Sequence, residues 1–129
     1  MEPSGFDITA GDAALIGVPS GQEVQLLDII WNSEGPDGPA PRFRFLAPAI
    51  ARQGGSIDFA AAEADLQHLC EGFVLAQLRP RGDVPPLILV SIADRAVPFG
   101  TSDPDATQYF ETFALQPSAN GITCIREIF

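Results

Sequence analysis

Runs of apolar and β-branched residues alternate with proline- and glycine-rich segments, and they predict a chain built mainly of strands. Residues 23–31 and 87–92 are apolar over most of their length, which is typical of buried strands. Residues 42–46 alternate arginine with phenylalanine, the two-residue period of a strand with one buried face. The intervening segment 32–41 contains three prolines and two glycines, so we expect a hairpin with a long tip. Residues 13–18 could add a short strand.

One helix is predicted over residues 58–78. Ser56 or Asp58 can cap its first turn through a side-chain oxygen, and Pro80 stops the pattern. The apolar stripe at helical spacing consists of Phe59, Ala62, Leu66, Leu69, Cys70, Phe73 and Gln77,. The single histidine, His68, lies on the opposite side of the helix and is expected to face solvent.

The segment 104–115 fits either a helix that begins near Asp103 or a strand. We expect a strand, because the turn-forming residues 116–121 and the apolar run 122–128 would complete a hairpin. The predicted fold class is therefore α+β. It consists of an antiparallel-dominated sheet of about five strands, with one long helix packed on one face.

The length of 129 residues predicts one domain over 1–129, with residues 1–12 as a loosely held arm,. Seventeen acidic against seven basic residues give a net charge of −10, which argues against nucleic acid or an anionic membrane surface as a partner. No apolar run approaches the ~20 residues of a membrane-spanning helix. The sequence leaves the oligomeric state open.

No recognised catalytic or cofactor motif is present. Phosphate-binding and dinucleotide-binding glycine patterns are absent, and two cysteines with one histidine cannot complete a zinc site. His68 has no evident partner for acid–base work. We therefore expect no catalytic residue, no metal and no cofactor, and a function that is more consistent with binding than with catalysis.

The two cysteines, Cys70 and Cys124, form either buried thiols or one disulfide. Cys70 belongs to the apolar stripe of the helix, and Cys124 shares a strand face with Ile122. We predict a Cys70–Cys124 disulfide, which would indicate an oxidising compartment. Residues 1–20 lack the basic start and apolar centre of a signal peptide. A periplasmic or secreted location and a cytoplasmic one therefore both stay open.

Asp28 interrupts an apolar strand face and is a possible buried acid. If that face is buried, we expect its carboxylate to pair with an arginine or to accept backbone N–H groups. If Trp31 pairs near Arg42 across the hairpin, five residues share one face. These five, a possible partner surface, are Leu27, Ile29, Trp31, Arg42 and Arg44. Large apolar groups mixed with arginine are typical of interface centres.

Several stretches, in order, carry a resemblance to a known family. They are Val18-Pro19-Ser20-Gly21-Gln22, Arg42-Phe43-Arg44-Phe45, Ala47-Pro48-Ala49-Ile50-Ala51, Asp65-Leu66-Gln67-His68-Leu69-Cys70, Ser91-Ile92-Ala93-Asp94-Arg95 and Thr123-Cys124-Ile125. The chain resembles a small uncharacterised family of alphaproteobacterial proteins, some labelled acetolactate synthase. Nothing in 129 residues supports that label, because a thiamine-diphosphate enzyme needs a cofactor domain. The resemblance implies export of longer members and no catalytic residue.

Three functional hypotheses follow. The first is a non-enzymatic, exported accessory or protein-binding module. The second is a small ligand-binding protein or enzyme with a carboxylate/arginine pocket beside the helix, formed by Asp28, Asp94 and Arg95. The third is a subunit of a larger assembly.

Overall fold

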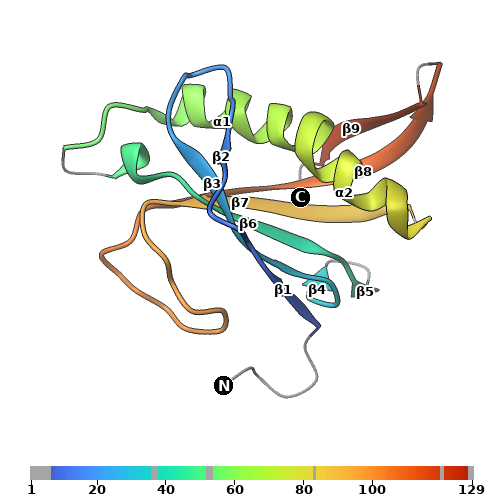
Figure 1. Ribbon diagram of the computed structural model, residues 1–129, viewed down its shortest axis with the longest axis horizontal. Coiled ribbons are helices and arrows are strands. Elements are labelled where there is room, and N and C mark those ends of the chain that lie inside the picture. Colours follow the sequence, from blue (N-terminus) through green and yellow to red (C-terminus); the bar gives the residue numbers. More distant parts are fainter. Residues whose placement is uncertain (1–6, 36–37, 52–53, 83, 120, 128–129) are drawn as a thin grey trace.

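A computed structural model describes residues 7–35, 38–51, 54–82, 84–119 and 121–127. The fold has two layers, a twisted mixed sheet and a long helix that crosses one of its faces (Figure 1). The described part of the sheet has seven strands, ordered β1-β3-β6-β7-β8-β9 with β2 also paired to β3. The strands are β1 (Ile8–Ala10), β2 (Leu15–Ile16), β3 (Val24–Ile30), β6 (Arg42–Leu46), β7 (Leu87–Ala93), β8 (Gln108–Ser118) and β9 (Gly121–Glu127).

The α+β class, the mostly antiparallel sheet and the single long helix are confirmed, whereas the strand count exceeds the expected five or so. The excess comes from two short strands, β1 and β2, which both pair with β3. β1 belongs to the segment expected to be a loose arm, and its backbone hydrogen bonds to β3 account for its order. The long tip between β3 and β6 holds the small hairpin of β4 (Glu34–Gly35) and β5 (Gly38–Pro39).

One strand pair, β6 with β7, is parallel. The chain leaves β6 through a short 3-10 turn, Pro48–Ile50, and returns to β7 through the long helix. Such a crossover is the connection that parallel neighbours require. β7 therefore lies between β6 and β8, as a central strand should, and β8 and β9 form the predicted terminal hairpin.

The helix begins after Asp58, whose Oδ1 accepts the Ala61 N–H at 2.9 Å. It runs as α1 (Phe59–His68), a π-helical segment η2 (Leu69–Val74), α2 (Leu75–Leu78) and a last 3-10 turn η3 (Arg79–Arg81). His68 is exposed, as predicted.

The π-helical segment changes which side of the helix is buried near its end. The predicted stripe continued through Phe73 and Gln77. Phe73 is partly buried and packs edge-on against Phe45, but the buried residues there are Val74, Leu75 and Leu78. A π turn holds one extra residue, so the positions that face the sheet move forward by one after it. The core consists of this stripe packed on the inner face of the sheet, including Phe43, Phe45 and Phe113.

The predicted disulfide is present and joins Cys70 of the π segment to Cys124 of β9. Both residues are buried. The bridge fixes the helix to the edge strand of the sheet. At the other edge, Asp65 fixes the segment before β3 to the same helix. Its carboxylate is fully buried and accepts hydrogen bonds from the Ser20 N–H at 3.0 Å, the Ser20 hydroxyl at 2.5 Å and Gln22 Nε2 at 2.7 Å.

Candidate functional site

The sheet face opposite the helix carries two arginines side by side on β6. Phe43 and Phe45 point into the core, so the alternation of the strand turns Arg42 and Arg44 to the other face,. In the register of the sheet, Arg44 lies between Asp28 of β3 and Ser91 of β7. The two guanidinium groups therefore leave the sheet roughly 7 Å apart along one strand.

Arg44 uses all three of its side-chain nitrogens in hydrogen bonds to the protein. Its Nε and Nη2 donate to the two oxygens of Asp28, each at 2.7 Å, and its Nη1 donates to the Val97 carbonyl at 2.8 Å. The Phe99 ring lies beneath its guanidinium at 5.5 Å. This is the arginine pair that the sequence predicted for Asp28, and the two-point geometry fixes the Arg44 side chain.

Arg42 differs from Arg44 because no described residue forms a hydrogen bond or ion pair with its side chain. Its Nε is buried without an acceptor, while its terminal nitrogens have no partner either and reach solvent. Burial lowers the pKa of Arg42, the nearby Arg44 lowers it further, and Asp28 offsets part of this. An arginine side chain nevertheless stays protonated at neutral pH. The structure thus holds a positive charge with unused donors.

These two arginines line a pocket of about 410 Å³ between the sheet and the loop 94–107. Leu27, Ala93 and Gln108 contribute from the sheet side, and Val97, Phe99 and Thr101 contribute from the loop. The lining is therefore mixed, with one cationic wall and several apolar side chains. We call this hollow the arginine pocket.

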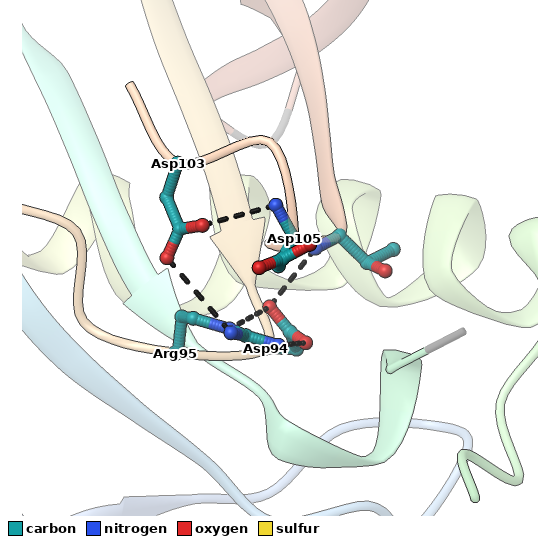
Figure 2. Close-up of polar contacts among 5 residues, drawn as sticks. Asp94, Arg95, Asp103 and Asp105 are labelled. Carbon is teal, nitrogen blue, oxygen red and sulfur yellow. Dashed lines mark hydrogen bonds and ion pairs between the residues drawn. The ribbon is translucent and has the colours of Figure 1, made fainter. Parts of the chain in front are cut away.

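Asp94 ties the two ends of that loop together (Figure 2). Its N–H donates to the Thr107 carbonyl at 3.0 Å, and its Oδ1 accepts the Thr107 N–H at 2.9 Å. Arg95 holds both oxygens of Asp94 and lies 3.8 Å from Asp103, whose other oxygen accepts the Asp105 N–H. Burial would raise the pKa of Asp94, but the hydrogen bonds from Arg95 and Thr107 outweigh it and lower the pKa.

The structure does not bring Asp28, Asp94 and Arg95 around one pocket beside the helix. Asp28 is held by Arg44 on the face opposite the helix, and Asp94 and Arg95 form the base of the loop without lining the pocket. The sequence predicted an arginine as one of two possible partners for Asp28, but it did not show that Asp94 pairs with its neighbour Arg95.

The five residues expected on one partner surface lie on two faces. The hairpin pairs Ile30, not Trp31, with Arg42, so Ile29 lies opposite Phe43,. The bulge between Leu26 and Asp28 then reverses the alternation, so that Leu26 lies opposite Phe45,. Ile29 is consequently in the core at 2% exposure. Trp31 packs edge-on against Phe43, with Arg81 stacked 3.7 Å above its ring. Leu27 stays with Arg42 and Arg44 at the arginine pocket.

A second, larger hollow of about 560 Å³ lies between the end of the helix and the β8–β9 hairpin. Leu75, Leu78 and Ile122 form its floor, with Glu71 and Arg79 of opposite charge among its lining. Within the described residues, none of its polar atoms is buried without a partner. The arginine pocket is therefore the stronger candidate for a site.

The described part of the chain has neither a candidate membrane span nor a candidate metal cluster. None of its helices is long and apolar enough to cross a membrane. No group of three or more histidine, cysteine, aspartate or glutamate residues among the described ones is arranged to hold a metal ion.

Comparison with known proteins gives a family but no function. Residues 4–129 match a family of unknown function (DUF6497), and the chain belongs to this family. A search of the curated proteins gave no match, and a search of the solved structures gave none either.

Proposed function

We propose that this member of the family is a non-enzymatic binding module and that it holds the anionic group of a ligand in the arginine pocket. The observation that carries the proposal is Arg42, a charged and partly buried side chain without an acceptor among the described residues. Leaving a buried donor unpaired costs about 1–3 kcal/mol. An anion that binds the terminal nitrogens of Arg42, which reach solvent, would pair its open donors and balance its charge,.

The charge distribution supports the same conclusion. The chain carries a net charge of −10, yet the pocket combines two guanidinium groups with the single carboxylate of Asp28. Burying a positive charge away from water costs free energy unless an anion pairs with it. Among the three hypotheses from the sequence, ligand binding therefore has the most specific structural support.

Binding is favoured over catalysis by the residues of the pocket wall. The described lining residues that carry polar side chains are Arg42, Arg44, Ser91, Thr101 and Gln108. The described part of this wall includes no histidine, carboxylate, cysteine or lysine, the side chains that most often act as general acid or base,. They do supply hydrogen-bond donors that orient a ligand.

We further propose a periplasmic or secreted location for this module. A buried disulfide between the helix and the edge strand supports an oxidising compartment. The test is the mass of the protein isolated from its native cells, unfolded in denaturant so that any buried thiol is accessible, and alkylated without reductant. Unmodified cysteines would support export, and two alkylated cysteines would contradict it.

The binding proposal is tested by thermal unfolding of the full chain in the presence of acetate, hexanoate, sulfate or phosphate. Three proteins are compared: the wild type, Arg42→Gln and the control Arg79→Gln. Arg79 is exposed at the end of the helix, so the control removes the same charge away from the pocket. At least one anion should raise Tm for the wild type and the control but not for Arg42→Gln. Equal shifts in all three proteins, or no shift in any, would refute the proposal.

A further inference from the structure

We infer that the ligand of the arginine pocket is a small monocarboxylic acid with an apolar body. This inference rests on the proposed function, and it names the chemical class that the site selects. Three features of the pocket carry it: its net charge, the geometry of its open donors, and the character of its remaining walls.

The pocket has one positive charge that the described part of the protein does not neutralise, and a ligand with one negative charge would balance it. Asp28 neutralises Arg44 through two hydrogen bonds, and this leaves the charge of Arg42. A monoanion makes the pocket neutral. A phosphate carrying two charges would leave an excess negative charge in a protein whose net charge is already −10, and the field of the whole chain opposes such a ligand.

The open donors match a carboxylate. All the hydrogen bonds of Arg44 described above go to protein acceptors, whereas the terminal nitrogens of Arg42 have none. A guanidinium presents two parallel N–H groups to a carboxylate. A phosphate site usually adds backbone N–H groups from a helix N-terminus or a glycine-rich loop. The long helix packs on the opposite face of the sheet from this pocket (Figure 1).

The remaining walls match an apolar body. Leu27 and Ala93 on the sheet and Val97 and Phe99 on the loop line the pocket. The Phe99 ring is held in place by its stacking on Arg44. The volume of about 410 Å³ lies in the range of small-molecule sites. The acid group would face Arg42, and the carbon chain would lie between the sheet and the loop.

The test is calorimetric titration of the full chain with straight-chain carboxylates from acetate to octanoate, and with hexanol and inorganic phosphate. Each methylene that enters the pocket should tighten binding about fourfold, until the pocket is filled. Hexanol, which has the chain without the charge, should bind much more weakly than hexanoate. Arg42→Gln should lose hexanoate binding, and Arg79→Gln should retain it.

A second variant, Phe99→Ala, separates the apolar wall from the charge. This variant should still bind acetate weakly, but its affinity should rise much less with carboxylate chain length than that of the wild type. Equal unfolding midpoints of variant and wild type would show that the loop still folds. The titration of the wild type with carboxylates of increasing length tests the apolar wall even if this variant does not fold.

The outcomes distinguish the two proposals. If affinity does not rise with chain length, or if phosphate binds more tightly than hexanoate through Arg42, the ligand class is wrong and an anion-binding function stands. If no anion binds in an Arg42-dependent way, both proposals fall.

Discussion

The Asp28–Arg44 pair gives the sharpest test of how the pocket is built, through the substitution Asp28→Ala. The two side chains are 16% and 11% exposed, and their two hydrogen bonds are both 2.7 Å long. Removing one partner leaves a mostly buried guanidinium with a single remaining acceptor, the Val97 carbonyl. A fully buried pair loses about 3–5 kcal/mol when one partner is removed. Because this pair is partly solvated, we expect a loss of about 3 kcal/mol in the free energy of unfolding.

The assay is urea unfolding followed by far-UV circular dichroism. With a slope of about 1.5 kcal/mol per molar urea, the midpoint should fall by about 2 M. Asp28→Asn retains one acceptor oxygen, so its urea midpoint should fall by roughly half as much. Asp7→Ala is the control, because Asp7 is exposed and its side chain has no described partner, and it should change stability by less than about 0.5 kcal/mol.

A double-mutant cycle isolates the contact itself. Adding Arg44→Gln to Asp28→Ala removes the stranded charge, so the double variant should lose less than the sum of the two single losses, with a coupling of about 1–3 kcal/mol. The same Asp28 variants also increase the positive charge of the pocket, so anion affinity should rise even though stability falls. Unchanged midpoints for Asp28→Ala would show that the pair contributes nothing, and additive losses would show that the two residues act separately.

Three other predictions follow from the polar and covalent contacts. Asp65→Ala strands three donors and should cost about 3 kcal/mol in urea unfolding, whereas a loss below about 1 kcal/mol would mean that solvent replaces the carboxylate. Burial raises the pKa of Glu111 above its ordinary value, so its contribution to stability is fully present below about pH 4.5 and is lost as the pH rises through the folded-state pKa. Glu111→Gln should therefore be at least as stable as the wild type at pH 7 and show a flatter pH profile above pH 4.5, and a less stable variant at pH 7 would contradict this. Replacing Cys70 and Cys124 by alanine opens a loop closed across 54 residues and should cost about 4 kcal/mol by the loop-entropy model, so an unchanged thermal midpoint would refute a stabilising bridge.

The sequence by itself determined the long helix, the longer strands and the broad fold class, but not the short strands β1, β4 and β5. The charge–aromatic alternation of residues 42–46 predicted β6, and the helix was predicted between a cap at Ser56 or Asp58 and the proline at 80. These predictions succeeded because alternation, capping and proline stops act over a few residues. The Asp28–arginine pair followed from the cost of burying an unpaired carboxylate, and the cysteine pairing followed from which faces their elements bury.

Tertiary structure alone decided the register and the site. The bulge after Leu26 reversed the faces of β3, and the π turn at Leu69–Val74 moved the buried stripe of the helix forward by one residue. The bulge and the π turn each insert one extra residue into a regular repeat of side-chain directions. Packing against the neighbouring layer, not the local sequence, selects the position of that residue. The pocket depends on this register and on a loop that folds back to Arg44 from 53 residues away. Contacts at that separation depend on the whole sheet, which is why the sequence identified Arg42 and Arg44 but not the pocket between them.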